Sequence, residues 1–416
     1  MQLLEGVVRP YAWGSRTAIA ALRGKPVPSP HPEAELWFGA HPAGPAWCLG
    51  ADGEPAGDLL TAIDTDRDVV LGAQTADRFA GRLPFLLKVL AAEEALSLQA
   101  HPSSEQAREG FERENRLGIP IDAPDRNYRD PWHKPELVVA VTEFEALAGF
   151  RDPRVTVELL RELQVSELDP YLGMLAGQPD FEGLRALFTT WLTLPESRIA
   201  TLVPAVLAGA VEQLGAGNTR FAAELRTVLE LGEDYPSDPG VLASLLLNRI
   251  HLEAGEGLYL PAGNLHAYLR GTAVEIMANS DNVLRGGLTP KHIDVPELLR
   301  VLDFTPAAPV DLTPPVRTVG AERVYLTPAP EFRLSRVELD GTGLHGPSSI
   351  SFDMPGPQIV SVLTGTAEVR PAGGSPVAVP QGRAIWIADD DPDVVVRAAS
   401  SKVVFFRARV PVGAAD

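Results

Sequence analysis

A block with helical periodicity interrupts a chain that otherwise consists of short, strand-like segments. From Asp152-Pro153 to about residue 248, stretches such as VTVELLREL and RFAAELRTVLELG repeat their apolar residues every three or four positions, as amphipathic helices do. On both sides, runs such as LPFLLKVL and ELVVAV are bounded by Pro, Gly and charged residues, as buried strands are. The sequence therefore predicts a mainly β protein with a helical insertion.

The length and the C-terminal pattern indicate several domains. A chain of 416 residues exceeds what one hydrophobic core usually organises. The last hundred or so residues are short strand-like segments separated by Gly and Pro turns, which is the pattern of a sandwich or barrel. The predicted units are a discontinuous β domain (1–152 with 249–318), a helical insertion (153–248) and a C-terminal β domain (319–416).

Smaller elements can also be predicted. Ser103 to Leu117 begins with a Ser-x-x-Gln capping pattern and predicts a helix. HIDVPELLRVL predicts another helix, and DLTPPV after it is typical of a linker.

Charge and cysteine content restrict the partners. The formal net charge of −19 argues against an extended surface for nucleic acid or an acidic membrane. No secretory pattern is visible at the N-terminus, and the longest near-apolar run, Ile199 to Val211, is too short to span a membrane. The only cysteine, Cys48, cannot form an intramolecular disulfide, and we interpret it as a small buried apolar group. We expect a cytoplasmic protein without nucleic-acid or membrane partners.

Two segments combine histidine with carboxylate or amide side chains. In LSLQAHP, Gln99 and His101 are two positions apart on a predicted strand, so both point to the same face. In YRDPWHKPELVV, Glu136 lies at the mouth of a buried strand, where a carboxylate is costly unless it is paired or binds a metal. Pairing with Lys134 is the simpler explanation of Glu136. Strand alternation separates His133 from the face that Lys134 and Glu136 share, so His133 is the weaker ligand candidate.

A third segment, EAGEGLYLPAGNLHAYLRG, resembles the second signature of cupins, small β-barrels with an internal metal. Gly255, Pro261, Gly263 and His266 have the offsets of that signature, and Arg270 stands where it usually has Asn. Gln99, His101, Glu136 and His266 together offer oxygen and nitrogen ligands without a thiolate, which is typical of a catalytic zinc site. Ligand type alone is compatible with another divalent metal.

Longer motifs resemble type I mannose-6-phosphate isomerases, over most of residues 1–304. They are YAWG at 11–14, ELWFGAHP at 35–42, LPFLLKVL at 83–90, SLQAHPS at 97–103, HKPE at 133–136 and HAYLRGTAVEIMANSDNVLRGGLTPKH at 266–292. Two positions depart from that family: Trp132 replaces the usual Asn and Gly286 the usual Ala.

The resemblance implies two cupin-type jelly-roll β-barrels plus a helical domain, and one Zn²⁺ per chain. It implies that zinc is bound by Gln99, His101, Glu136 and His266, and that Arg285 is essential. The implied activity is a zinc-dependent aldose–ketose isomerase that interconverts D-mannose 6-phosphate and D-fructose 6-phosphate, feeding mannose catabolism or GDP-mannose synthesis. The sugar-phosphate contacts that we expect are Lys88, Lys134, Glu275, Asp281 and Tyr268, with Trp13 and Lys291. We expect a monomer.

The chemistry assigns alternative roles to several of these residues. Isomerisation needs a base that moves a proton between C2 and C1 through an enediol, and Glu275 and Lys134 are the candidates. Asp281 either orients Arg285 or assists ring opening, and Arg285 stabilises the developing anion or holds the phosphate. An acidic protein needs a local positive cluster to bind phosphate, and we expect Lys88, Lys134, Arg285 and Lys291 to form it. A snorkelling lysine at position 88 and a strand carboxylate paired with a base at position 275 are the structural alternatives.

Two other functions fit part of the pattern. A metal-dependent cupin dioxygenase would use a similar His/Glu site, but the basic residues disfavour an apolar substrate. A non-catalytic sugar-binding cupin would not need the complete ligand set and Arg285. In the C-terminal unit, Gly382 has a comparable setting, but Ala388 replaces Pro and Asp393 replaces His, so we expect a metal-free cupin-like barrel. For the remaining histidines, His31, His41, His251, His292 and His345, we expect exposed or capping roles.

Overall fold

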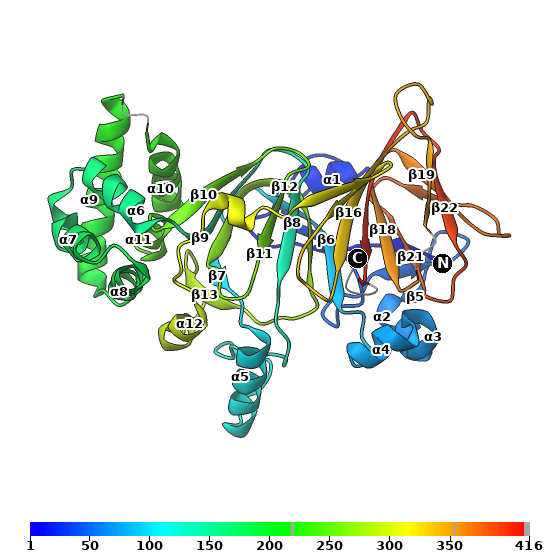
Figure 1. The fold of residues 1–416 in the computed structure, drawn as a ribbon, viewed down its shortest axis with the longest axis horizontal. Helices are drawn as coiled ribbons and strands as arrows, with labels where there is room; N and C mark the ends of the chain where they lie inside the picture. The colour runs from blue at the N-terminus through cyan, green and yellow to red at the C-terminus, as the bar shows by residue number, and fades with distance from the viewer. Residues whose placement is uncertain (218–219, 353–354, 412–416) are drawn as a thin grey trace.

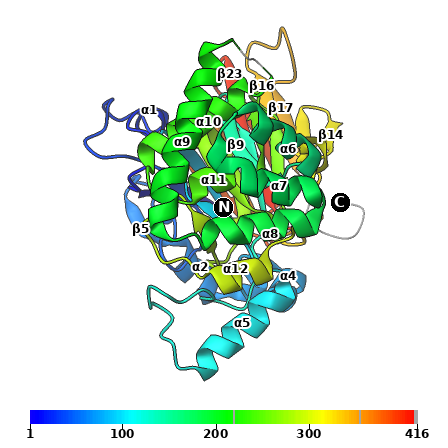
Figure 2. The ribbon, with the colours of Figure 1, turned by 90° about the vertical axis from the view of Figure 1, so that its left-hand side faces the viewer.

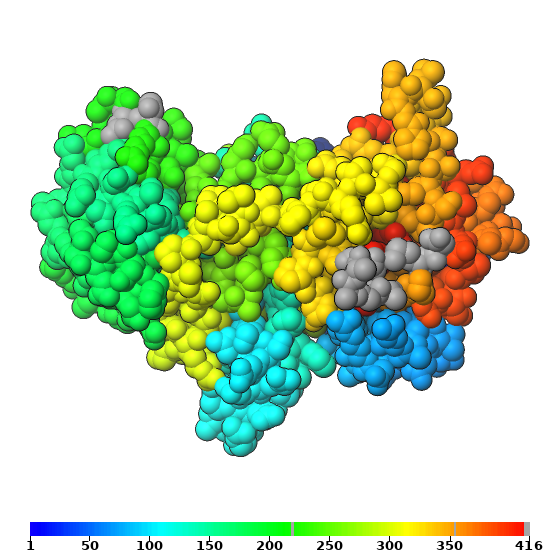
Figure 3. Space-filling model, viewed as in Figure 1, coloured from blue at the N-terminus to red at the C-terminus, as the bar shows by residue number. Residues whose placement is uncertain are grey.

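The computed structural model describes residues 1–217, 220–352 and 355–411. Figure 1 shows the helices that follow β9 at one end, the strands between β6 and β13 in the middle, and the C-terminal strands at the other end. The space-filling view in Figure 3 shows the same order, with the segment of α5 projecting below the middle of the molecule. The fold is mainly β with inserted helices, as the sequence predicts.

The central β unit contains the strands from which the candidate site is built. Its main path runs β10-β9-β12-β6-β3-β2, and β8, β11, β7 and β13 pair at its side. The strands are β2 (Val7–Arg9), β3 (Glu35–Phe38), β6 (Phe85–Ala92), β7 (Leu98–Ala100), β8 (Glu136–Ala140), β9 (Phe144–Phe150), β10 (Leu247–Leu252), β11 (Gly257–Leu260), β12 (His266–Ala278) and β13 (Leu284–Gly287). The long strand β12 pairs antiparallel with β6, β7, β8 and β9, so it connects the strands that carry Lys88, Gln99 and Glu136.

The C-terminal strands form two sheets, one of which includes strands from the N-terminus. The first sheet runs β14-β15-β16-β23-β18-β21-β1-β4-β5, and the second runs β17-β22-β19-β20. The strands are β1 (Gln2–Glu5), β4 (Trp47–Leu49), β5 (Pro55–Asp58), β14 (Val316–Val319), β15 (Glu322–Tyr325), β16 (Arg333–Asp340), β17 (Ser349–Phe352), β18 (Gln358–Thr364), β19 (Thr366–Pro371), β20 (Val377–Pro380), β21 (Ala384–Ile387), β22 (Val394–Ala398) and β23 (Lys402–Arg409). Part of the segment that we assigned to the first β domain therefore extends a sheet of the second.

The inserted helices cover one end of the central unit, in front of β9 in the view of Figure 2. They are α6 (Pro153–Glu162), α7 (Asp169–Gly177), α8 (Phe181–Leu192), α9 (Glu196–Gly215), α10 (Ala222–Asp234) and α11 (Gly240–Ser244), with a 3-10 turn η1 (Ser166–Leu168). Leu98 and Leu284 from the sheet share one hydrophobic core with helical residues such as Phe188 and Val206. This core fixes the backs of the strands whose other faces bear the candidate residues.

No single helix among the described residues is long and apolar enough to cross a membrane; α8 and α9 meet that test only as a pair bent by 113°.

Helix caps explain where the smaller elements begin. Helix α5 (Ser104–Arg116) starts after Ser103, whose hydroxyl accepts from the Gln106 N–H while the Gln106 side chain accepts from the Ser103 N–H, a capping box as predicted. Helix α12 (Val295–Val301) starts after Asp294, which caps the Glu297 N–H. The predicted linker is instead partly ordered: the 3-10 turn η2 (Pro309–Leu312) leads into β14.

The sequence analysis did not predict the short helices before β6. They are α1 (Ala18–Leu22), α2 (Leu59–Thr65), α3 (Arg67–Leu71) and α4 (Ala73–Arg78). Elements of one or two turns carry too few apolar repeats to give a periodic signal.

Candidate active site

Three of the four predicted metal ligands form a compact buried group. One ligand atom from each of His101, Glu136 and His266 lies within 4.8 Å of the others. The carboxylate is central: Oε1 lies 3.2 Å from His101 Nε2 and Oε2 lies 3.3 Å from His266 Nε2. Gln99 is opposite His266 on one side of β7 and opposite Arg285 on the other. The fourth candidate therefore lies beside the group.

The donor atoms of this group fit a bound metal. Among the described residues, His101 Nε2, His266 Nε2 and Glu136 Oε2 are buried without a hydrogen-bond partner. The other ring nitrogens are engaged: His101 Nδ1 donates to the Asn282 carbonyl at 2.8 Å, and His266 Nδ1 donates to the Asn264 carbonyl at 3.0 Å. Both Nε2 lone pairs therefore face Glu136, the arrangement of metal-binding histidines. Burial lowers the pKa of His101 to about 4, which keeps the ring neutral as a ligand must be.

The glycine-containing turn before β12 links two of these ligands. Gly255 and Gly263 have φ angles of 90° and 77°, which side-chain-bearing residues rarely adopt. The Gly263 N–H donates to the His101 carbonyl at 2.9 Å, and a Cβ at Gly263 would lie 3.0 Å from the Val301 carbonyl oxygen. The turn thus brings the start of β12, with His266, to the end of β7, with His101.

A β-bulge explains how one strand presents residues of opposite parity to the same side. His266 and Tyr268 are even-numbered, whereas Glu275 and Met277 are odd-numbered, yet Tyr268, Glu275 and Met277 line one cavity. The pairing of β12 with β9 shifts register between Tyr268 and Arg270. One extra residue reverses the alternation of side chains, so the second half of β12 also faces the site.

Below the metal group lies a buried network of charges. Lys88 on β6 is opposite Glu275 on β12, and its Nζ lies 2.5 Å from Glu275 Oε2 and 3.4 Å from Glu35 Oε1. The Tyr268 hydroxyl donates to Glu275 Oε1 at 2.6 Å. Burial lowers the pKa of Lys88, but the surrounding carboxylates outweigh it and hold that pKa above its usual value. Lys88 is therefore a charged partner of two carboxylates rather than a snorkelling lysine.

Glu275 itself experiences opposing influences. Burial, with the negative charges of Glu136 and Glu35, raises its pKa above the ordinary value against the effect of Lys88. Glu35 was not among the predicted site residues. It is held by the Trp37 indole, whose N–H donates to its Oε2 at 2.6 Å.

Asn282 connects the two loops that carry the site. Its carbonyl accepts from His101, and its side-chain amide donates to the carbonyls of Asp130 and Trp132, each at 2.8 Å. Its side-chain oxygen accepts from the Arg129 N–H at 2.7 Å. Lys134 follows on the same loop, and its Nζ lies 3.2 Å from Glu136 Oε1. Glu136 therefore contacts the predicted lysine partner as well as the two histidines.

Cations without carboxylate partners gather at the mouth of the site. Within the described ranges, no acidic side chain lies in ion-pair range of Arg129, Arg285 or Lys291, and all three line the same cavity. Burial and the charge of Arg129 lower the pKa of Arg285, and burial with both arginines lowers that of Lys291. All four cations of the predicted cluster line this cavity, but Lys88 and Lys134 also lie in ion-pair range of carboxylates. Arg129, which the analysis missed, joins Arg285 and Lys291. Its place in YRDP, just before HKPE, was the available signal.

One cavity of about 590 Å³ connects these groups. The predicted residues that line it are Trp13, Lys88, Gln99, Lys134, Glu136, Tyr268, Glu275, Asp281, Arg285 and Lys291. Neither His101 nor His266 lines this cavity; both are buried beside it with Glu136.

Among the remaining histidines, one departs from its prediction. His41 is buried and lines the cavity, so it is not exposed. His31, His251, His292 and His345 are exposed, as predicted. His133 points away to Glu331 in the C-terminal unit, with Nε2 2.6 Å from its carboxylate. Cys48 is buried as predicted, and burial raises its thiol pKa to about 11.

Comparisons with known proteins find a consistent set of relatives. The family model "Phosphomannose isomerase type I, catalytic domain" matches residues 1–153. The mannose-6-phosphate isomerase of Escherichia coli (strain K12) is 42% identical over 341 residues, 82% of this chain and 84% of that protein. The Homo sapiens mannose-6-phosphate isomerase is 34% identical over 361 residues, 82% of each chain.

Solved structures agree over nearly the whole chain. A crystal structure of a zinc-bound mannose 6-phosphate isomerase has a TM-score of 0.88 and 36% identity and covers 99% of both chains. A variant of phosphomannose isomerase from Salmonella typhimurium has a TM-score of 0.88 and 35% identity, covering 99% of this chain and 100% of that one.

Proposed function

Because the chain belongs to the mannose-6-phosphate isomerase family, we propose that it interconverts D-mannose 6-phosphate and D-fructose 6-phosphate with one zinc ion per chain. The observation that carries this proposal is the buried group of His101, Glu136 and His266, in which both Nε2 atoms and Glu136 Oε2 have no hydrogen-bond partner among the described residues. The group lies beside a cavity lined by three cations that have no carboxylate in ion-pair range within the same described ranges. In a sugar phosphate, the sugar oxygens suit the metal group and the phosphate suits the cations.

Zinc would be held by His101, Glu136 and His266, with Gln99 as the fourth ligand. When bound, it supplies Lewis-acid polarisation of a sugar oxygen. Asn282 and Asn264 would fix the tautomers of the two histidines, because each backbone carbonyl accepts from an Nδ1.

Arg285, Lys291 and Arg129 would hold the phosphate. Phosphate oxygens form strong charge-assisted hydrogen bonds with guanidinium and ammonium groups. The absence of carboxylates within ion-pair range of these three side chains, in the described parts of the chain, leaves their charges available to a substrate. This local cluster explains how a protein with a net charge of −19 binds an anion.

For the proton transfer between C2 and C1, the contacts favour Lys134 over Glu275. Lys134 Nζ lies 3.2 Å from the proposed ligand Glu136 and lines the cavity. Both oxygens of Glu275 are already engaged, by Tyr268 and Lys88. Glu275 with Lys88 would then set the charge of the site rather than exchange the proton.

Asp281 would assist ring opening rather than orient Arg285. Among the described residues, its carboxylate pairs with His41 and makes no ion pair with Arg285. It also lines the cavity, where a carboxylate can accept a proton from the anomeric hydroxyl. Trp13 and Tyr268 complete the walls of the sugar site.

Further features of this proposal concern organisation and setting. We propose the domain division given above, with a cupin-type jelly-roll barrel in each β unit and the C-terminal one free of metal. A monomeric, cytoplasmic enzyme without nucleic-acid or membrane partners, supplying mannose catabolism or GDP-mannose synthesis, fits the acidic charge and the single cysteine. The dioxygenase and sugar-binding alternatives have no support from the relatives.

The decisive test is conversion of mannose 6-phosphate to fructose 6-phosphate by purified protein, before and after chelation and with zinc restored. Turnover that disappears with chelator and returns with zinc supports the proposal. Glu136→Gln should abolish turnover, whereas Glu143→Gln, a matched change on the exposed surface, should not. A folded, zinc-loaded protein without turnover would refute the substrate assignment.

A further inference from the structure

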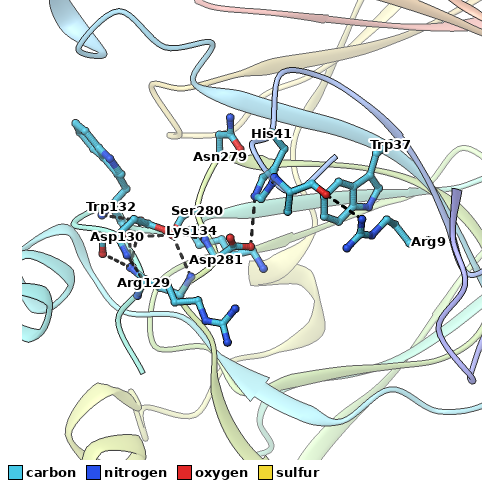
Figure 4. A network of polar contacts seen from close by, with 12 residues as sticks. Arg9, Trp37, His41, Arg129, Asp130, Trp132, Lys134, Asn279, Ser280 and Asp281 are labelled. Atoms are coloured by element: carbon cyan, nitrogen blue, oxygen red, sulfur yellow. Dashed lines mark hydrogen bonds and ion pairs between the residues drawn. The ribbon is translucent and has the colours of Figure 1, made fainter. Parts of the chain in front are cut away.

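His41 lies in the wall of the cavity and contacts Asp281. Its Nε2 lies 3.3 Å from Asp281 Oδ1, and its side chain is 4% exposed, against 46% for that of Asp281. Figure 4 shows the imidazole pointing at the Asp281 carboxylate from the loop after β3. The two residues come from distant parts of the sequence. The His41 side chain is enclosed by protein, whereas the Asp281 carboxylate is partly exposed.

The other side of the His41 ring is tied to the backbone. The Ala43 N–H donates to His41 Nδ1 at 3.1 Å. Nδ1 therefore carries no proton, so Nε2 must carry one and donates it toward Asp281. Arg9 holds Ala43 in turn, because its guanidinium donates to the Ala43 carbonyl at 3.0 Å.

Packing fixes the plane of the ring. His41 and Trp37 form a T-shaped contact with ring centroids 5.0 Å apart, and the Arg9 guanidinium lies over the Trp37 ring, 4.6 Å from its centroid. Trp37 is itself held through its hydrogen bond to Glu35. The donor that faces Asp281 is therefore preorganised before any substrate binds.

Asp281 needs such a donor because it has no other side-chain anchor among the described residues. Its backbone N–H donates to Asp130 Oδ2 at 2.8 Å, which fixes the backbone, while its carboxylate is half-exposed to the cavity. The charged groups around it are Lys134, Arg129 and Asp130. Without His41, that carboxylate could rotate toward either cation.

We propose that His41 is a positioning residue, which holds the Asp281 carboxylate in the orientation that ring opening requires. This inference rests on the proposed function, since it deepens the role of Asp281 in the same site. The usual arrangement, in which an aspartate orients a catalytic histidine, is reversed here because the histidine is buried and the aspartate faces the substrate.

A double-mutant cycle tests the inference in the zinc-loaded full chain. His41→Phe keeps the packing against Trp37 but removes the donor, and we expect kcat to fall about 10- to 100-fold with KM nearly unchanged. His41→Gln retains an amide N–H near the position of Nε2 and should recover most of the loss. In an Asp281→Asn background, His41→Phe should have no further effect, because His41 acts only through Asp281.

Two other readouts separate positioning from stability. Removal of the donor should move the acidic limb of the kcat/KM profile to higher pH in the wild-type background but not with Asp281→Asn. Nitrogen NMR of histidine-labelled protein should show His41 protonated at Nε2 and not at Nδ1. Unfolding temperatures of all variants serve as the folding control.

The outcomes distinguish the two proposals. If wild-type, zinc-loaded protein shows no turnover, the proposed function fails, and the NMR tautomer still decides the geometry of the His41–Asp281 contact. If wild-type turnover is present, unchanged kcat in His41→Phe, additive losses in the cycle, or an Nδ1-protonated ring would overturn the positioning role alone.

Discussion

Lys88 and Glu275 stand opposite each other in the β6–β12 pairing and form an ion pair of 2.5 Å in the buried floor of the site. Glu35 lies 3.4 Å from the same ammonium group. One lysine thus compensates two carboxylates, and Glu136 lies close enough to influence its pKa. The negative charges of these buried carboxylates are compensated only while Lys88 is present.

We expect Lys88→Met to destabilise the fold by about 3–5 kcal/mol, because it leaves buried carboxylates uncompensated. Urea unfolding, with chelator present in every sample, measures the change. Adding Glu275→Gln to Lys88→Met should restore part of the stability, since it removes one of the unpaired charges. Lys402→Met, at an exposed lysine near Glu338, is the matched control and should change stability little. A double variant less stable than Lys88→Met would contradict this account.

Asn282→Ala should weaken zinc binding about 10- to 100-fold. The Asn282 side chain anchors this residue to the Asp130–Trp132 loop, and its backbone carbonyl orients His101, so the substitution should loosen that carbonyl. Competition with a chromogenic chelator measures the affinity without reference to turnover. Asn279→Ala, which removes another buried amide of the same segment with a hydrogen bond to Leu83, is the control. Equal zinc affinities of the two variants would rule out the role of Asn282.

Replacing Arg129 by Met should raise KM for mannose 6-phosphate about 10-fold and change kcat much less. The loss of one charge-assisted hydrogen bond to phosphate costs about 1.5–3 kcal/mol, and the phosphate is bound equally in the ground and transition states. Initial rates over a range of substrate concentrations separate the two constants. Arg116→Met, on the exposed end of α5, should leave both unchanged. A selective fall in kcat would instead place Arg129 among the groups that act on the reacting carbons.

Cys48 should react slowly with a thiol reagent in the native state, even at pH 9. Burial, followed by the charge of Asp58, raises its pKa to about 11, and the thiolate is the reactive form. Absorbance of the released reagent group should show one equivalent appearing only when denaturant is added. Rapid stoichiometric reaction of the folded protein would disprove the burial of this thiol.

The local sequence predicted much of the fold and of the site. The Ser103–Gln106 capping box, the helical periodicity after Asp152 and the glycine offsets before His266 each depend on residues close together in the chain, so they can be recognised without the fold. Motifs that resemble the family identified the four candidate metal ligands and Arg285. These are short-range signals, and they are reliable because backbone conformation is decided locally.

Other features depended on contacts between distant segments. Strand alternation alone would place Tyr268 and Glu275 on opposite faces, and only the bulge in the β9–β12 pairing brings both into the cavity. The strand β1 pairs with β21, near the other end of the chain. Lys88 pairs with two carboxylates from separate strands. No local sequence pattern indicates either contact.

His41 and Arg129 illustrate the same limit within the site. By sequence each is a polar residue in a loop; tertiary packing buries the first against Trp37 and Asp281 and places the second beside Arg285 and Lys291. The sequence by itself determined the elements and the chemical types of the site residues, because periodicity, caps and turn glycines act within a few residues. Only the tertiary structure decided which charges are compensated and which remain free for a substrate, because electrostatic pairing depends on distances between strands and loops that are far apart in the chain.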